Sequence, residues 1–304
     1  MASEAENPKK NVLISGASGM IGGAICEALT LTGYRVFPLI RNKSAGPHYY
    51  LQESDYMHLD SSTPLHAIVN LAGQNISKQR WNQKVKNDIV ESRTKLTRSL
   101  SEAMAQLPVQ PEVFLSASAI GYYGTDQSKT FDENDHAGTD FLAKLASDWE
   151  DATKAARQSG IRTVHLRFGL VLHPNDGILK NLLLPFRLAC VGPIGNGEQA
   201  MSWISLRDAV NILTKLIDQD SFEGPLNIVS NQPVSNKDFA AALAKSINRF
   251  SLPKIPSPIV RLMFGEMADA ALLPSASIKS IRMQELGIEL EDTELNSALK
   301  KMFS

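Results

Sequence analysis

The chain has 304 residues, of which 43% are hydrophobic and 21% are charged, as in an ordinary folded globular protein. Lysine and arginine number 31 against 32 for aspartate and glutamate, so the formal net charge is -1. This balance does not favour a nucleic acid or a membrane as the main partner, and the length suffices for a large sheet-centred core with a smaller lobe.

The compartment is expected to be reducing, and the cytoplasm is the simplest choice. Cys26 and Cys190 have no metal-binding spacing and can form at most one disulfide, so no metal site is expected. Residues 1–10 are polar and lack the apolar stretch of a secretory signal. Charged residues and prolines interrupt the apolar stretch 178–194, which is therefore not a predicted membrane span.

Apolar runs of strand length alternate with longer segments of helical character in the first half of the chain. Strands are expected at residues 12–15, 35–40, 67–71, 113–116 and 163–168. Helices are expected at residues 20–31, 83–107 and 137–159. Because helical crossovers join parallel strands, the predicted fold class is α/β, with a doubly wound parallel sheet.

This alternation ends after Gly169, where prolines and glycines become frequent. A helix at residues 206–217, a strand at 226–229 and a helix at 239–247 are expected beyond this region. We therefore expect a sheet domain over residues 10–176, to which the helix 206–217 returns. Residues 177–304 are expected to form a region that covers the site and a smaller mixed α/β lobe.

The sharpest local motif is Ser15-Gly16-Ala17-Ser18-Gly19-Met20-Ile21-Gly22, placed where the first strand meets the first helix. Gly16 permits a tight turn, Gly19 lets the backbone approach a pyrophosphate, and Gly22 lets the helix pack closely on the sheet. The helix N-terminus favours an anion. The pattern predicts a dinucleotide site that includes Ser18, Met20 and Ile21; a simple tight turn is the alternative.

Arg41 follows the second predicted strand, at the place where an NAD site usually has an acidic residue for the ribose 2′-hydroxyl. A guanidinium there can pair with the 2′-phosphate of NADP, and no acidic residue lies between Gly33 and Glu53. The predicted cofactor is therefore NADP. The alternative is a solvated loop arginine beside Lys43.

Further short motifs follow the glycine turn along the chain. They are Asn70-Leu71-Ala72-Gly73, the stretch from Trp81 to Ser92-Arg93, Ser116-Ala117-Ser118-Ala119, Gly121-Tyr122-Tyr123-Gly124, Trp149-Glu150, Leu166-Arg167-Phe168-Gly169, Gly192-Pro193-Ile194-Gly195, Trp203-Ile204 and Asp208. Together they resemble the extended short-chain dehydrogenase/reductase superfamily, and more closely its atypical, epimerase-like branch. Phe264-Gly265-Glu266 and the last helix resemble the C-terminal module of unknown function of that branch.

The resemblance covers nearly the whole chain and implies further cofactor-binding residues. Asn70, Leu71, Ala72 and Gly73 would lie along the dinucleotide, with Asp88 and Arg93 reaching it from the long helix. Ala72 and Gly73 have no bulk to block a cofactor. For Asp88, a solvated helix charge is the alternative.

The resemblance also exposes a departure, because no Tyr-x-x-x-Lys pair follows the predicted serine strand and no tyrosine occurs after Tyr123. Ser118 stands where the superfamily places its catalytic serine. Tyr122 or Tyr123 could supply the missing phenol, although a structural or stacking role is the alternative for both. Lys144 has acidic neighbours four residues away on each side, which indicates a surface ion pair.

Two functional hypotheses remain open. The first is an NADP-dependent oxidoreductase or epimerase acting on a small or nucleotide-linked substrate, with Ser118 and Tyr122 or Tyr123 near the nicotinamide. Arg167, Trp203 and the glycine-rich loop 192–197 would belong to its substrate or lid region. The second is a non-catalytic NADP-binding redox sensor or partner-binding protein. The substrate and a homodimeric state stay open.

Overall fold

The computed structural model describes residues 10–39, 52–53, 56–57, 62–77, 79–187, 192–251 and 253–304. Arg41, the predicted reader of the 2′-phosphate, lies outside the described residues. No helix in the described part of the chain has both the length and the apolar character needed to cross a membrane.

A six-stranded parallel sheet forms the centre of the molecule, in the order β12-β8-β6-β5-β1-β2. Its strands are β1 (Asn11–Ser15), β2 (Arg35–Leu39), β5 (Ala67–Asn70), β6 (Val113–Ala119), β8 (Arg162–Phe168) and β12 (Gly224–Ile228). The chain passes from β1 to β2 on one side and then returns to β5 on the other. The direction of winding therefore changes between β1 and β5, and a ligand of a doubly wound sheet binds at such a point.

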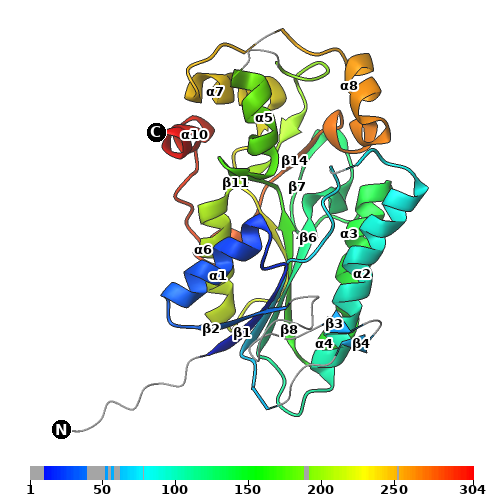
Figure 1. Cartoon of the computed structure of the whole chain (residues 1–304), viewed down its shortest axis with the longest axis vertical. Coiled ribbons are helices and arrows are strands. Elements are labelled where there is room, and N and C mark those ends of the chain that lie inside the picture. The colour runs from blue at the N-terminus through cyan, green and yellow to red at the C-terminus, as the bar shows by residue number, and fades with distance from the viewer. Residues whose placement is uncertain are drawn as a thin grey trace, which may run out of the picture.

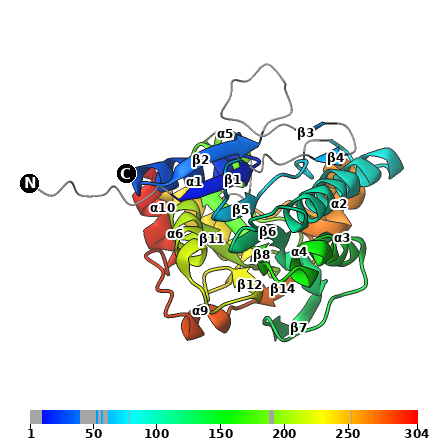
Figure 2. The same cartoon turned by 90° about the horizontal axis from the view of Figure 1, so that it is seen from below.

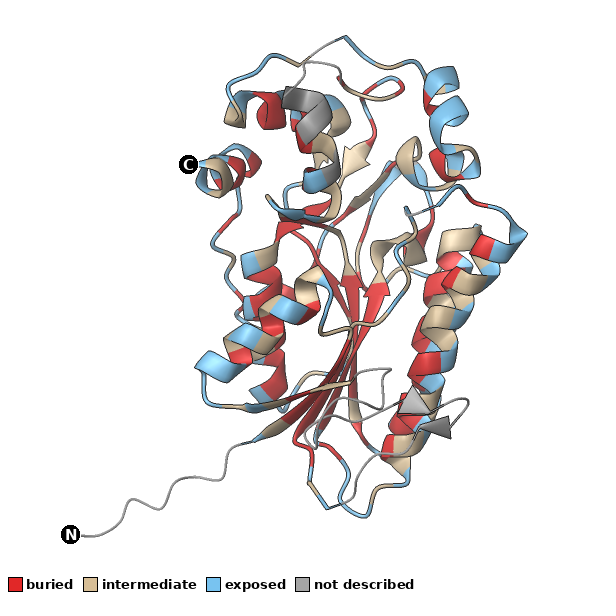
Figure 3. Ribbon diagram, in the orientation of Figure 1, coloured by how far each residue is buried: buried red, intermediate tan, exposed pale blue. Residues whose placement is uncertain are grey.

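Helices cover both faces of this sheet (Figures 1 and 2). One face carries α1 (Met20–Leu31) and α6 (Leu206–Asp218), and the other carries α2 (Gln83–Ala105), α3 (Phe141–Asp151) and α4 (Lys154–Gln158). The four inner strands β8, β6, β5 and β1 are almost entirely buried, whereas the edge strand β2 is more exposed (Figure 3). The predicted α/β doubly wound class is confirmed.

The second half of the chain builds a lobe above the carboxyl ends of the strands (Figure 1). Its helices are α5 (Gly177–Arg187), α7 (Asn236–Ser246), α8 (Ser257–Phe264), a π-helical turn η2 (Ala268–Leu272) and α10 (Leu295–Phe303). The short helix α9 (Arg282–Glu285) instead packs on edge strand β12 of the sheet (Figure 2). Two short two-stranded pairs join this lobe to the sheet domain: β9 (Leu170–His173) with β11 (Trp203–Ser205), and β7 (Asp126–Phe131) with β14 (Ala276–Ile278). A third pair, β10 (Ala200–Met201) with β13 (Val234–Ser235), lies within the lobe. The remaining pair is β3 (Gln52–Glu53) with β4 (Tyr56–Met57).

The sheet draws on chain from both sides of residue 176, because β12 is its edge strand and α6 packs beside α1 in its largest core cluster. The helix expected at residues 137–159 is divided instead into α3 and α4. Asp140 caps the start of α3 by accepting a hydrogen bond from the Ala143 amide. The hydroxyl of Thr153 donates to the Glu150 carbonyl at the break between the two helices.

Candidate functional site

Two positions in the glycine turn after β1 require glycine because of backbone conformation and close contacts with the protein's own backbone. Gly16 has a φ of +73°, and a Cβ there would lie 2.8 Å from the backbone of Leu71. A Cβ on Gly22 would lie 2.1 Å from the Gly16 carbonyl oxygen. The turn therefore holds α1 against β1 and against the segment that follows β5 at a distance that no side chain permits.

Gly19 differs from these two glycines. Its φ of -83° and ψ of 169° are ordinary for any residue. Among the described residues outside its neighbours, a Cβ there would meet one atom within 4 Å, the Gly16 carbonyl oxygen at 3.3 Å. The protein itself therefore places little demand on Gly19, and the space beside it is open to a ligand.

The N-terminus of α1 has no side-chain cap and no acidic residue in its first turn. Four other helices, α2, α3, α6 and α7, begin with a side chain that accepts a hydrogen bond from a backbone amide, and these capping residues are Asn82, Asp140, Ser205 and Ser235. The first amides of α1 are thus left for an anion, and the positive end of the helix dipole favours one there.

Buried hydrogen bonds hold the segment after β5 beside the glycine turn. The Ser15 hydroxyl donates to the Asn70 side-chain oxygen at 2.6 Å and accepts a bond from the Ala72 amide at 3.3 Å. Asn70 also donates to the Thr97 hydroxyl at 2.7 Å and is itself fully buried. Asn70 therefore positions Leu71 and Ala72 from behind rather than lining the open side.

Arg93 fixes the other end of that segment. Its guanidinium donates to the carbonyls of Gln74 at 2.9 Å and Ile89 at 3.1 Å, and lies 5.1 Å from the centre of the Trp149 ring. Burial lowers its pKa to about 10. Asp88, in contrast, pairs with Lys84 at 3.0 Å on the exposed side of α2. The structure thus brings Arg93 to the loop and leaves Asp88 on the solvent side.

A buried ion pair between Arg167 and Glu150 lies at the carboxyl end of β6. The Arg167 guanidinium donates to both carboxylate oxygens of Glu150, each bond at 2.8 Å, and the Ser118 hydroxyl donates to the same carboxylate at 2.7 Å. Burial alone would raise the pKa of Glu150, but the bonds from Arg167, the charge of His165 and the bond from Ser118 hold it below its usual range. The Ser118 hydroxyl is therefore already committed to a protein partner.

Tyr123 is committed in the same way. Its hydroxyl accepts a bond from Arg167 and donates to the Asn227 side-chain oxygen, both at 2.8 Å. Burial raises the pKa of this phenol to about 12. The network continues to Glu133, whose carboxylate accepts bonds from the Asn227 amide at 3.0 Å and from the Ser280 hydroxyl.

Tyr122 has a different environment. The Arg167 guanidinium carbon lies 3.4 Å from the centre of its ring, a cation–π contact. Within the described part of the chain its hydroxyl makes no hydrogen bond, and the residue is half-buried. Of Ser118, Tyr122 and Tyr123, Tyr122 is therefore the one whose hydroxyl has no hydrogen-bond partner among the described residues.

The first turns of α3, where the Tyr-Lys pair of a short-chain dehydrogenase would be expected, present an apolar face. Leu145 is buried in a cluster with Trp81 and Met267, and Phe141 and Leu142 pack against this cluster. The Phe141 and Trp81 rings meet edge to face at 5.4 Å. This apolar face of α3 carries no acid or base, and Lys144 in the same turns is exposed.

Trp203, a predicted substrate residue, is fully buried in the core of the upper lobe, and its indole N–H donates to the Gln232 carbonyl at 3.2 Å. Arg167 is buried as well. Glu150, Glu133 and Asn227 were not among the residues expected at the site. Glu150 stands in the quoted Trp149-Glu150 motif, whereas nothing local marks the other two.

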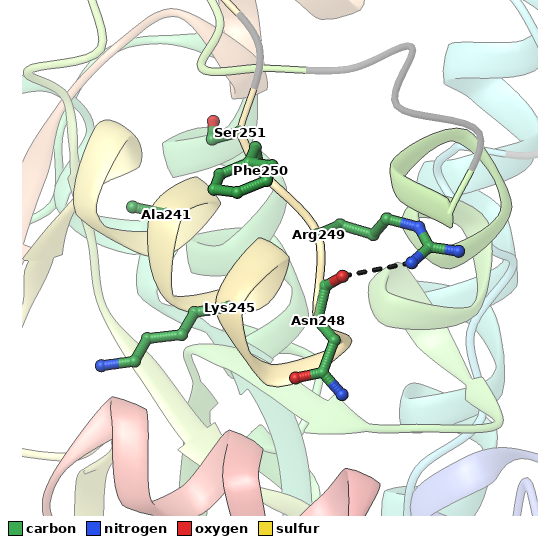
Figure 4. A pocket seen from close by; sticks show the side chains of 6 residues that line it. All are labelled: Ala241, Lys245, Asn248, Arg249, Phe250 and Ser251. Carbon is green, nitrogen blue, oxygen red and sulfur yellow. Dashed lines mark hydrogen bonds between the residues drawn. The ribbon is translucent and has the colours of Figure 1, made fainter.

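A surface hollow lies at the end of α7, away from the glycine turn (Figure 4). It is lined by Ala241, Lys245, Asn248, Arg249, Phe250 and Ser251. Arg249 donates to the Asn248 carbonyl at 3.1 Å, and Asn248 adopts a left-handed φ of 55°. Among the described side chains, no group of three histidine, cysteine or acidic residues could hold a metal.

Comparison with known proteins supplies relatives over almost the whole chain. The family model described as "NAD dependent epimerase/dehydratase family" matches residues 12–229. Epimerase family protein ML0860 of Mycobacterium leprae is 38% identical over 293 residues, which are 96% of this chain and 95% of that protein. Human epimerase family protein SDR39U1 is 31% identical over 294 residues, 96% of this chain and 99% of that protein. A crystal structure of human SDR39U1 with NADPH matches with a TM-score of 0.86 at 30% identity, over 96% of this chain and 98% of that one.

Proposed function

The chain belongs to the NAD dependent epimerase/dehydratase family, and we propose that it binds NADPH and transfers hydride between it and a small or nucleotide-linked substrate. The single observation that carries the proposal is the uncapped N-terminus of α1 behind the glycine turn, at the point where the winding of the sheet reverses. The solved relative with NADPH supports the choice of cofactor.

In this proposal the pyrophosphate lies against the first turn of α1. Its contacts come from the turn itself, namely Gly16, Ser18, Gly19, Met20, Ile21 and Gly22. Leu71, Ala72 and Gly73 flank the dinucleotide, while Asn70 and Arg93 hold that segment in place. Arg41 pairs with the 2′-phosphate. When bound, the nicotinamide supplies the hydride.

Proton transfer is proposed to use Tyr122, the hydroxyl without a hydrogen-bond partner in the described protein. Ser118 and Tyr123 are engaged by Glu150, Arg167 and Asn227, so we assign them to positioning. Arg167, stacked on the Tyr122 ring, supports that ring from behind. Trp203 is assigned to the packing of the lobe that covers the site.

A second candidate is a non-catalytic NADPH-binding sensor. The apolar face of α3 and the engaged hydroxyls of Ser118 and Tyr123 favour it, because a carbonyl substrate would meet few free acids or bases. For both candidates we propose a reducing compartment such as the cytoplasm. In support, burial raises the pKa of the free Cys26 thiol, which makes it less reactive.

The test is NADPH oxidation over a panel of ketones, aldehydes and nucleotide sugars, with NADPH affinity measured in parallel. Slow turnover is expected, and Tyr122→Phe should reduce it by about 10²–10⁴-fold without weakening NADPH binding. Ser118→Ala and Tyr123→Phe are the matched hydroxyl deletions and should cost less. Tight NADPH binding with no turnover on any substrate would favour the sensor, and turnover that survives Tyr122→Phe would remove Tyr122 from the mechanism.

A further inference from the structure

The net charge of the whole chain hides a local excess of positive charge. Residues 239–265 contain four cations and no acidic residue, a run that includes the end of α7 and all of α8. The four cations are Lys245, Arg249, Lys254 and Arg261, and all are exposed. We call residues 239–265 the cationic segment.

The same segment carries the main concentration of exposed apolar side chains in the described structure. Ile259, Leu262 and Met263 on α8 are 47%, 74% and 59% exposed, and their spacing of three and four residues places them on one stripe of the helix. Only Val260 of α8 is buried. Phe250, just beyond α7, is 91% exposed.

These two apolar elements lie at one end of the molecule, since α7 and α8 both stand at the end opposite the N-terminus (Figure 1). Figure 4 shows Lys245, Arg249 and Phe250 extending from the end of α7. Arg261 pairs with Asp269 at 2.9 Å, so its charge is compensated locally. Lys245 and Lys254 have no ion-pair partner among the described residues, so this end of the molecule keeps positive charge.

We propose that the cationic segment docks on an anionic lipid bilayer, with the α8 stripe and Phe250 entering the headgroup region and the lysines facing the acidic lipids. Apolar side chains surrounded by lysine and arginine are typical of interfacial helices. With eight residues, α8 is only about 12 Å long, so it lies in the surface and does not span it.

Charge decides between the bilayer and a second copy of this chain. Two copies meeting through the cationic segment would bring like charges together, whereas an acidic bilayer attracts both lysines at once. A protein partner would also need to bury about 800 Å² on this surface, which is more than a helix of two turns offers by itself. A bilayer, in contrast, needs no groove, and α8 and Phe250 are exposed at the same end of the molecule.

The experiment is flotation of the full-length protein with vesicles of phosphatidylcholine, with or without about one third phosphatidylserine. Binding is expected only to the vesicles with phosphatidylserine and should decrease at high salt. Because each lysine near an acidic surface contributes about fivefold, Lys245→Gln with Lys254→Gln should weaken binding about 25-fold. Leu262→Gln should weaken it at least about tenfold.

Leu31→Gln is the matched control, since Leu31 on α1 is 81% exposed and lies outside the cationic segment. It should bind vesicles like the wild type, and thermal unfolding should show that every variant folds, because the substituted side chains are exposed. The proposal is overturned if the wild type binds neither vesicle, binds both equally, or binds unchanged after Leu262→Gln. A dimer in light scattering that Leu262→Gln dissociates would also overturn it, by assigning the surface to a second copy.

Discussion

The end of β1 and the end of β6 are separated only by β5 in the same sheet, yet their polar groups are used in opposite ways. At the end of β1 the helix amides have no side-chain cap, and a Cβ on Gly19 would meet a single atom of the described protein within 4 Å. At the end of β6 the hydroxyls of Ser118 and Tyr123 are bonded to buried protein partners. One strand end is left for a ligand, while the other is largely satisfied by the protein itself.

This contrast separates binding from chemistry within one family fold. A dinucleotide needs backbone amides without a protein partner and small residues beside them, and the end of β1 has both. Proton transfer needs a free acid or base close to the reacting atom, and the described protein has used most of its candidates for internal bonding. Each half of the contrast can be tested by substitutions that leave the other half intact.

The largest effect on stability is expected from breaking the buried ion pair between Glu150 and Arg167 at the end of β6. Arg167→Met leaves the Glu150 carboxylate buried without its cation, and loss of one partner of a buried pair costs about 3–5 kcal/mol of the free energy of unfolding. Urea denaturation measures this loss. Lys84→Met, which breaks the exposed pair with Asp88, is the control and should cost less than about 1 kcal/mol.

Replacing both members of the pair separates stability from function. The double variant Glu150→Met with Arg167→Met removes the uncompensated charge and should recover much of the lost stability. If Arg167→Met is no more destabilised than Lys84→Met, Arg167 and Glu150 do not form a buried ion pair at the end of β6. Variants that remain folded should keep their NADPH affinity, because these residues do not line the glycine turn.

The next largest effect concerns the open end. Gly19→Val should reduce NADPH affinity by at least about a hundredfold, on the order of 3 kcal/mol, because the new side chain fills the space beside the turn. The free energy of unfolding should change much less, since the φ of Gly19 is ordinary and a Cβ there meets a single described atom within 4 Å, the Gly16 carbonyl oxygen, which at 3.3 Å must shift by a few tenths of an ångström. Calorimetric titration and urea denaturation measure the two quantities.

Gly23→Ala is the matched control on the same helix. A Cβ at Gly23 would lie 3.6 Å from the nearest atom outside its neighbours, the Ala17 carbonyl oxygen, which is an ordinary contact. Alanine should therefore stabilise α1 by about 0.5–1 kcal/mol and leave NADPH binding unchanged. A folded Gly19→Val protein with wild-type NADPH affinity would show that the open end is not the cofactor site.

A smaller effect should appear in the pH dependence of folding. His165 lies behind Glu150 and shares a 2.9 Å hydrogen bond with Thr153, and burial lowers its pKa to about 4 from an ordinary 6.5. The unfolded chain therefore takes up a proton that the folded chain refuses, so stability falls as the pH decreases from 6.5 towards 4. Between about pH 7 and pH 5 the loss should be about 2 kcal/mol.

His165→Gln, which keeps a hydrogen-bonding group beside Thr153, should remove this part of the pH dependence. Glu150 titrates in a lower range, because its pKa is held below the ordinary 4.5, so its contribution is lost only under more acidic conditions. Denaturation of both proteins across the acid range is the measurement. Identical pH profiles for His165→Gln and the wild type would mean that His165 is not the group responsible.

The sequence predicts the structure at the end of β1 better than the structure at the end of β6, and the reason is physical. The glycine turn is local, so one stretch of eight residues predicts the strand, the turn and the open helix end. The ion pair at the end of β6 depends on contacts between residues far apart in the sequence. The β6–β8 register places Ser118 opposite Arg167, and Glu150 comes from α3, which lies between those strands in the chain. No spacing in the sequence specifies that three-way contact.

The same limit applies to the face of α3. The sequence shows that the Tyr-Lys pair is absent, but the residues that pack there come from distant parts of the chain. Met267 lies more than a hundred residues beyond Leu145 and reaches the same cluster. Helix boundaries were also displaced by single side chains, because the Asp140 cap sets the start of α3 after residue 140.

The last effect, and the one that depends on sequence alone, concerns Arg41. Arg41→Ala should weaken NADPH binding by about tenfold or more and leave NADH binding nearly unchanged, since only NADPH carries the 2′-phosphate and a charge-assisted hydrogen bond contributes about 1.5–3 kcal/mol. Titration of the wild type and the variant with both cofactors measures it, with Lys43→Ala as the control for a neighbouring cation. Equal affinity of the wild type for NADPH and NADH would refute the assignment. If Lys43→Ala loses as much NADPH affinity as Arg41→Ala, the 2′-phosphate is held by the general positive charge of this stretch rather than by one bidentate contact.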